Sequence, residues 1–262
     1  MRLYVTLDSI LNMYPLSPCM VSDVVQCCAH CTVRHQAVCG AMDDQQVRKL
    51  AQIAHRKKIP AGRAIISDEE SVGFFANVIS GAIKLTKVLP DGRQQIVGLL
   101  FAPDFLGRAY SKNNPYTAEA ATEVELCTFP RAAFEELVKE YPDLQQRLLQ
   151  QTLAELDAAR DWMLLLGRKT AEEKVASFLY MLSRRSLMKA YTGKVTRGGA
   201  AFELPLTRSD IADYLGLTIE TVSRQLTRLK TSNVIHLATS RFVMVPDLGC
   251  LAQAAGTDCH KH

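Results

Sequence analysis

The sequence predicts an α+β protein in which a β-rich part, one long helix and a small α-rich part with a β-hairpin follow one another. Three observations indicate this order. Residues 58–130 alternate short apolar runs with Gly, Asp, Asn and Pro, which is typical of a compact β-barrel or roll. Residues 131–166 keep helical spacing with a break near Pro142, and residues 207–230 predict two short helices joined by a glycine turn.

The composition excludes several classes of protein. The 262 residues are 48% hydrophobic and 22% charged, which argues against a largely disordered chain. No run approaches the ~18–20 apolar residues of a membrane-spanning helix, and the first twenty residues lack the apolar core of a secretory signal. We therefore expect a cytoplasmic protein that makes no membrane contact. No G-x-S-x-G, H-E-x-x-H or P-loop string is present, so no motif predicts an enzyme.

Cysteines and positive charge gather at opposite ends of the chain. Residues 1–41 have no helical or strand period and hold five of the eight cysteines. Because disulfides are rare in a reducing compartment, such a group predicts a metal or redox site. Residues 168–246 hold 13 Lys and Arg against 6 Asp and Glu, a net of +7, whereas the whole chain has +4. This asymmetry predicts contact with a polyanion, although a solvated basic face gives the same pattern.

The long helix and its flanks span residues 131–167. We expect this segment to pair with the same segment of a second chain. From Leu149 the apolar and small side chains step by 3, 4, 3, 4 and 3, a seam of period 3.5 that buries best against an identical helix. In a parallel pair Glu155 would face Arg160 of the other chain. Packing on its own domain is the alternative, since the seam has fewer than three heptads. The predicted interface comprises Leu149, Thr152, Leu156, Ala159, Met163 and Leu166.

Residues 207–230 predict a helix-turn-helix. Thr207 and Asp210 have the spacing of a capping box, Gly216 suits the turn, and Thr218 can cap the second helix. The expected inward face of that helix is Ile219, Val222, Leu226 and Leu229. The opposite face is Glu220, Ser223, Arg224 and Thr227.

Such a second helix enters the major groove of DNA, where Arg pairs with guanine, Glu accepts from cytosine and Ser contacts a base or phosphate. An ordinary α-hairpin with a solvated polar face is the alternative. Residues 234–245 alternate in a way that predicts a β-hairpin wing, and residues 189–203 are Gly-rich and predict a loop or weak hairpin. We expect a DNA-binding domain over 168–246 and a disordered tail over 247–262.

Three stretches resemble the FNR/CRP superfamily of transcription regulators, and within it the oxygen-sensing FNR branch of proteobacteria. They are LGLTIETVSR at 215–224, LLLGRKTAEEKVASFL at 164–179 and CAHCTVRHQAVC at 28–39. The resemblance covers residues 28–246. It implies a β-roll sensor domain of the cyclic-nucleotide-binding kind over 42–130, a dimerisation helix and a winged helix-turn-helix.

The resemblance also implies the partners and the DNA-reading residues. Glu220, Ser223 and Arg224, with Thr218 and Thr221 beside them, would read a TTGAT-type half-site in double-stranded DNA. Two such sites make a palindrome that a homodimer binds, and RNA polymerase is the implied further partner.

The same resemblance assigns a ligand role to the spaced cysteines. Three thiolates come from Cys28-x2-Cys31-x7-Cys39, and an iron–sulfur cubane takes four. The resemblance implies a [4Fe-4S] cluster bound by Cys28, Cys31, Cys39 and Cys127, with an x7 gap similar to alphaproteobacterial variants. Cys27 ranks second to Cys28 as a ligand. Zinc held by four cysteines is the chemical alternative, and it would make the site a structural staple.

Nucleotide-binding members of the same fold use a Gly-Glu…Arg-Ser/Thr-Ala cassette. Here Arg108 follows Gly107, and Tyr116 stands where the phosphate-binding Arg would be, so the resemblance implies no cyclic nucleotide. The expected function is an oxygen-responsive regulator that binds its palindrome as a dimer when it carries the cluster. The alternative is a DNA-binding module with a structural zinc or no cofactor, whose binding oxygen does not change.

Overall fold

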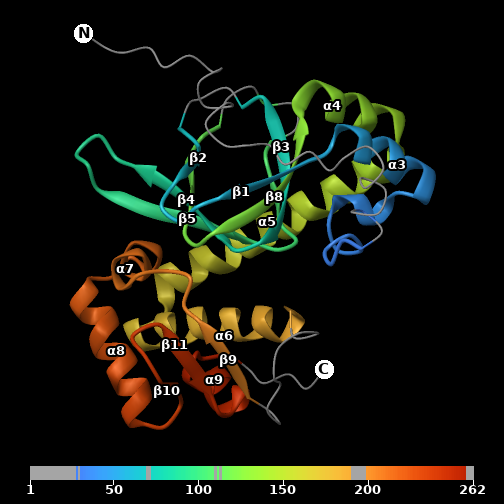
Figure 1. Cartoon of the computed structure of the whole chain (residues 1–262). Helices are drawn as coiled ribbons and strands as arrows, with labels where there is room; N and C mark the ends of the chain where they lie inside the picture. Colours follow the sequence, from blue (N-terminus) through green and yellow to red (C-terminus); the bar gives the residue numbers. More distant parts are fainter. Residues whose placement is uncertain are drawn as a thin grey trace. The chain divides into compact units, whose positions relative to one another are not determined.

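The computed structural model describes residues 28, 30–68, 72–108, 111, 114–189 and 199–257. The chain forms two compact units, a β-roll with its helices and a smaller, mainly helical unit toward the C-terminal end (Figure 1). The β-rich part, the long helix and the α-rich part of the predicted architecture are therefore all present.

Two four-stranded sheets make up the β-roll, which confirms the predicted fold. The first has the strand order β1-β8-β3-β6 and consists of β1 (His55–Ile59), β3 (Phe74–Ser80), β6 (Phe105–Leu106) and β8 (Val124–Pro130). The second has the order β2-β7-β4-β5 and consists of β2 (Ala64–Ile66), β4 (Ala82–Val88), β5 (Gln94–Phe101) and β7 (Thr117–Ala120). In β4, Ile83 and Leu85 are buried and Lys84 between them is half-exposed, because successive side chains of a strand point to opposite faces.

The first sheet buries apolar side chains on both faces. Ala76 and Val78 of β3 are buried in the core between the two sheets. Phe75 faces the other way and joins a second core with Phe129 of β8 and Phe134, whose ring centroid lies 5.2 Å from that of Phe75. Because successive side chains of a strand point to opposite faces, the odd-numbered residues of β3 line this outer face. We call this second group of buried residues the outer core.

Helices cover the outer core. The first, α3 (Asp44–Ile53), begins at a capping box in which Asp43 accepts from the backbone N–H of Gln46 at 2.8 Å. The next is α4 (Arg131–Glu140), which carries Phe134. The long α5 (Pro142–Arg168) follows after the extended residue Tyr141, so the predicted break near Pro142 is confirmed.

The second unit contains a winged helix-turn-helix, as predicted. Its elements are α6 (Ala171–Lys189), β9 (Ala200–Glu203), α7 (Arg208–Leu215), α8 (Ile219–Thr231), β10 (His236–Leu237), β11 (Phe242–Val245) and α9 (Leu248–Ala254). The wing has a third strand, because β9 pairs with β11 with Phe202 opposite Val243. The end of the Gly-rich stretch is thus a strand, where the sequence predicted a loop or weak hairpin.

The predicted disordered tail is wrong for residues 248–254, which form α9 on α6. Asp247 caps this helix by accepting from the backbone N–H of Gly249 at 2.7 Å, and Leu251 is fully buried. At the other end, Lys169 donates from Nζ to the backbone oxygen of Ala255 at 2.6 Å. The Gly and Ala content concealed a short helix whose stability comes from burial rather than from helical propensity.

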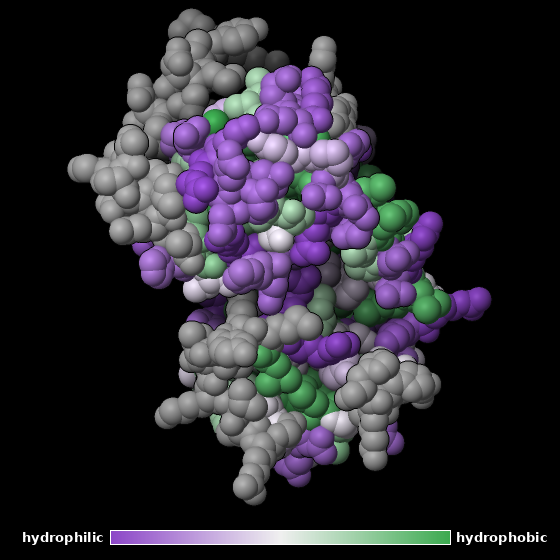
Figure 2. All heavy atoms as spheres, turned by 90° about the vertical axis from the view of Figure 1, so that its right-hand side faces the viewer, coloured by the Kyte–Doolittle hydropathy of each residue, from purple (hydrophilic) through white to green (hydrophobic). Residues whose placement is uncertain are grey.

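Hydrophobic side chains on the face drawn in Figure 2 form separate patches among hydrophilic ones. Within the part of the chain that the structure describes, no helix has both the length and the apolar composition that crossing a membrane requires.

The substitution Leu251→Ala should lower the free energy of unfolding by about 2–4 kcal/mol, because it leaves a cavity under a fully buried side chain. Gln253→Ala on the exposed side of α9 is the control and should change it by less than about 0.5 kcal/mol. Urea unfolding followed by circular dichroism measures both, and a small effect of Leu251→Ala would show that α9 is not packed.

Candidate metal centre and nucleic-acid interface

The described part of the cysteine arm, residues 28 and 30–41, is wound tightly onto the outer core. The backbone N–H of Cys31 donates to the oxygen of Cys28 at 3.4 Å, and that of Arg34 donates to the oxygen of Cys31 at 3.2 Å. The arm ends in the 3-10 helix η1 (Val38–Ala41), whose first residue is fully buried. A β-carbon at Gly40 would collide with the backbone oxygen of Arg34, so this close return of the chain requires glycine.

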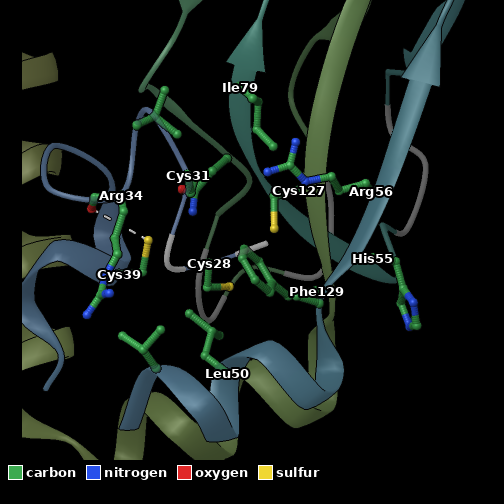
Figure 3. A pocket seen from close by; sticks show the side chains of 14 residues that line it. Cys28, Cys31, Arg34, Cys39, Leu50, His55, Arg56, Ile79, Cys127 and Phe129 are labelled. Atoms are coloured by element: carbon green, nitrogen blue, oxygen red, sulfur yellow. Dashed lines mark hydrogen bonds between the residues drawn. The ribbon is translucent and has the colours of Figure 1, made fainter. Parts of the chain in front are cut away.

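Four cysteines line one open pocket of about 610 Å³ between the arm and the first sheet. Cys28, Cys31 and Cys39 come from the arm, and Cys127 comes from β8, about ninety residues later in the chain (Figure 3). Leu50 of α3 contributes an apolar part of the wall. The structure thus brings the four residues that the resemblance implies as ligands to one place, which we call the cysteine pocket.

The remaining cysteines are not at this place, or they lie outside the described residues. Cys250 is exposed on α9, and it belongs to the other unit. Cys27 and Cys19 precede the described part of the arm. Among the described residues, no three His, Cys, Asp or Glu side chains are close enough to hold a single metal ion. The four thiols instead surround the cysteine pocket.

Burial and mutual repulsion raise the pKa of three thiols of the pocket, those of Cys28, Cys39 and Cys127. Burial, and then the neighbouring Cys31 and Cys28, raise the pKa of Cys39 from its ordinary 9.0 to about 11. Burial first, and other cysteines second, also raise the pKa of Cys127 and of Cys28. A metal cation would reverse this balance because its charge stabilises thiolates, so the four cysteines are a candidate ligand set for metal.

Two arginines in the pocket wall are each held by a carboxylate. Arg34 of the arm donates to Asp44 at 2.6 Å, and Arg56 of β1 donates to Glu125 at 2.7 Å. Both guanidinium groups act to lower the pKa of Cys28, although burial outweighs them. Their positive charge favours a net negative centre, which four thiolates around a metal provide.

One buried amide in the pocket has an unmet hydrogen bond. Asn77 of β3 lines the pocket and is 2% exposed, and its Oδ1 accepts a hydrogen bond from none of the described residues. An unpaired buried polar group costs about 1–3 kcal/mol. Four cysteines beside the Asn77 amide fit a zinc or iron–sulfur centre, because both bind soft thiolate ligands. Calcium and magnesium instead prefer oxygen ligands.

The cysteine arm is also joined directly to α5. Arg147 donates from Nη2 to the backbone oxygen of Gln36 at 2.6 Å, and Gln36 lies in the loop between Cys31 and Cys39. In the same turns of α5, Leu144 is fully buried in the outer core and Leu148 packs against it. The start of α5 is therefore fixed by the segment that carries three of the cysteines.

The predicted seam of α5 is largely exposed in the single chain. Its exposed members are Leu149, Thr152, Leu156, Ala159 and Met163, and the exposed fraction of Met163 is 72%. Leu166 is half-buried, while Leu153 and Leu164 are exposed apolar residues that the seam did not include. Arg160 donates to Asp157 of its own helix at 3.1 Å. A helix with this much exposed apolar surface suits a partner better than its own domain.

The caps of the helix-turn-helix match the sequence prediction. Thr207 and Asp210 form a complete capping box, with backbone-to-side-chain distances of 3.0 and 3.1 Å. Gly216 ends α7 with a left-handed φ of 62°. Thr218 accepts from the backbone N–H of Thr221 at 3.2 Å and so begins α8.

The outer face of α8 carries the residues expected to read DNA. Its exposed members are Glu220, Ser223, Arg224 and Thr227, and its buried side is Val222, Leu226 and Leu229. Ile219 is 46% exposed rather than inward, because a side chain in the first turn points back past the end of the helix. Thr221 is half-buried, and its Oγ1 accepts from Arg224 Nη2 at 3.4 Å, so it supports this arginine from the side.

The β-roll has a tyrosine at the position where the resemblance places the phosphate-binding Arg of nucleotide-binding members. Tyr116, which stands in place of the phosphate-binding Arg, packs against the core between the sheets. In a nearby pocket Arg131 is engaged by Glu135 at 3.0 Å and by the backbone oxygen of Val72 at 3.0 Å.

Comparisons with known proteins give two domain matches and several relatives. Residues 56–141 match the cyclic nucleotide-binding domain, and residues 173–254 match the Crp-like helix-turn-helix domain. The chain is 50% identical over 221 residues to a probable transcriptional activator of Rhizobium leguminosarum bv. viciae, covering 84% of this chain and 90% of that protein. It is 44% identical over 238 residues to the transcriptional activator protein FnrL of Cereibacter sphaeroides, covering 91% and 95%. The solved structure of FixK2 from Bradyrhizobium japonicum matches with a TM-score of 0.70 and 31% identity, covering 79% of this chain and 100% of that one.

In the metal-free, reduced protein, iodoacetamide should modify the exposed Cys250 well before Cys39. Alkylation needs the thiolate, and the raised pKa keeps Cys39 almost wholly protonated near pH 7.5. Modification of Cys39 should therefore quicken with pH up to about 11. Peptide mass spectrometry measures each site, and equal rates for the two cysteines at pH 7.5 would contradict the buried, mutually repelling thiols.

Proposed function

The chain belongs to the Crp/Fnr family of DNA-binding transcription regulators, and from this premise we propose that it responds to oxygen through a [4Fe-4S] cluster in the cysteine pocket. In this proposal the chain binds TTGAT-type palindromic sites as a homodimer while it carries the cluster. Cys28, Cys31, Cys39 and Cys127 are the ligands, and the protein acts in the cytoplasm with RNA polymerase as a partner.

One observation carries the proposal, namely that two segments far apart in the sequence bring four thiols to one pocket beside the start of α5. Thiolate ligands alone suit iron–sulfur clusters and zinc. When bound, a cluster supplies an oxidisable centre, which zinc is not. The second candidate function is therefore a DNA-binding module with a zinc staple, which the same four thiols favour.

The contact of Arg147 with Gln36 supports a route from the pocket to the dimer. Ligand cysteines on both sides of the Gln36 loop hold that loop in place when the pocket is filled. The loop in turn holds Arg147 and the first turns of α5, from which the exposed seam continues. Release of the ligands frees the loop, so the helix loses one of the contacts that orient it for pairing.

Pairing of two chains matters because the palindrome has two half-sites. Two paired helices set two copies of α8 about 34 Å apart, which is one turn of DNA. On each half-site Arg224, Glu220 and Ser223 are exposed and able to reach base edges. A cyclic nucleotide is not part of this proposal, and the packing of Tyr116 into the roll supports its exclusion.

Exposure of the oxygen-free protein to air should lower its affinity for a TTGAT palindrome by about 5- to 150-fold, which corresponds to a coupling of roughly 1–3 kcal/mol. Fluorescence anisotropy with a labelled duplex measures this before and after air. Cys127→Ser removes one ligand and leaves α8 unchanged, so this control should bind weakly in both states. An affinity that air does not change would support the zinc or cofactor-free alternative.

Replacing Arg224 by alanine should cost about 1–3 kcal/mol on the cognate site and relax the preference at one base pair. The side chain is exposed and steadied by Thr221, so little folding energy is at stake. The matched control is Arg228→Ala, one turn further along α8, which should leave base preference unchanged. If Arg224→Ala weakened binding equally on every sequence, this arginine would contact phosphate only.

Arg147→Met keeps the aliphatic stem and removes the bond to Gln36, so the oxygen-free dimer should weaken by roughly 5- to 30-fold, or about 1–2 kcal/mol. Sedimentation without oxygen measures the dimer, and iron content should stay at the wild-type level. Gln146→Met at the neighbouring exposed position should have no effect, and Met163→Glu should abolish dimers in any state. A wild-type dimer constant for Arg147→Met would refute this route.

A further inference from the structure

Asn77 stands out among the buried polar side chains of the described residues. Only Asn77, Asn114 and Ser183 are both polar and buried there. Asn114 donates to the backbone oxygen of Tyr116, and Ser183 donates to that of Leu179 at 2.8 Å. The carbonyl oxygen of Asn77 has no donor. A buried carbonyl oxygen without a donor costs free energy, and a group bound in the pocket that engages this amide would offset that cost.

The position of Asn77 indicates which group its amide can contact by a hydrogen bond. Asn77 of β3 lies directly opposite Cys127 of β8 in the antiparallel register, and both line the cysteine pocket. Opposite residues of such a pair point to the same face, with β-carbons about 4.5–5.5 Å apart. The amide has two N–H donors, and half a turn about its last bond exchanges oxygen and nitrogen, so a donor can be turned toward sulfur.

We propose that Asn77 donates an N–H···S hydrogen bond to a sulfur of the metal centre at Cys127 and thereby sets how readily that centre loses an electron to dioxygen. The inference rests on the proposed cluster in the cysteine pocket. It goes beyond it by giving a role to a residue that is not a ligand. Asn77 is a neutral donor, in contrast to Arg34 and Arg56, whose charges are already paired with carboxylates.

The direction of the effect follows from charge. A hydrogen bond to a sulfur stabilises the more negative, reduced state and so raises the reduction potential of an iron–sulfur centre. Oxidation moves one electron from the centre to dioxygen, which is thereby reduced. Without the Asn77 bond the reduced state is less stable, so the electron leaves more readily and bleaching in air is faster.

The test uses the full-length protein purified without oxygen. Asn77→Leu keeps a similar volume and removes both polar atoms, and Asn77→Ala is the second variant in case leucine does not fit. After mixing with air-saturated buffer, the half-time of the visible absorbance should be about 2- to 10-fold shorter than in the wild type, the effect of one ordinary hydrogen bond. Ile79→Ala is the matched control. It opens the same pocket wall from the same face of β3 without removing a donor. Its bleaching half-time should be closer to that of the wild type than the half-times of the Asn77 variants are.

A second measurement separates this role from a structural one. In the metal-free protein Asn77→Leu replaces a buried amide whose oxygen has no donor by an apolar group, so its Tm should rise by about 2–4 °C. An asparagine needed only for the fold would give the opposite sign.

The possible outcomes are distinct. If Asn77→Leu and Asn77→Ala retain the cluster and bleach at the wild-type rate, this inference fails and the proposed function stands. Faster bleaching of Ile79→Ala than of Asn77→Leu also overturns it, because access to the pocket would then be the cause. A wild-type protein without iron and sulfide overturns both.

Discussion

The docking of the cysteine arm onto the outer core is the contact on which the rest of the site depends. Residues 30–41 are too short to fold alone, and they are held because Val38 and Met42 are buried beside Phe75 and Phe129. That apolar anchor brings three thiols opposite a fourth on β8. It also brings the loop between them within reach of α5. The same burial that fixes the arm therefore creates both the proposed ligand set and its connection to the helix.

Electrostatics support the proposal that this assembly binds a metal. Burial makes the thiols of Cys28, Cys39 and Cys127 harder to ionise, and the neighbouring cysteines make them harder still. Two arginines partly offset this, but each is already paired with a carboxylate. Only a cation within the pocket can hold four thiolates together. Binding of the proposed centre then also stabilises the docked arm, and loss of the centre removes that stabilisation.

Local patterns made much of the fold predictable, because their cause lies within a few residues. The box of Thr207 and Asp210, the left-handed Gly216 and the break before Pro142 each follow from short-range geometry. Helix α9 and strand β9 were missed because each is stable only through residues distant in sequence, in α6 and β11. Ile219 was misassigned since the helical period ignores where a helix begins.

The candidate site divides in the same way. The four cysteines were suggested by spacing and resemblance, and the structure brings them to one pocket, although the metal itself stays a proposal. Neither Arg147 nor Asn77 was predicted, because the residue that each one faces lies about fifty residues or more away in the sequence. A polar residue in the apolar run FFANVIS was the one available hint for Asn77.

The central claim is that these four thiols hold one iron–sulfur centre, and its most direct test is chemical analysis of protein isolated without oxygen. Iron, acid-labile sulfide and zinc should be measured per chain in the wild type and in Cys127→Ser. The account predicts about four iron and four sulfide in the wild type, with both lost from the variant. One zinc per chain without sulfide, or iron and sulfide retained in full by Cys127→Ser, would contradict it.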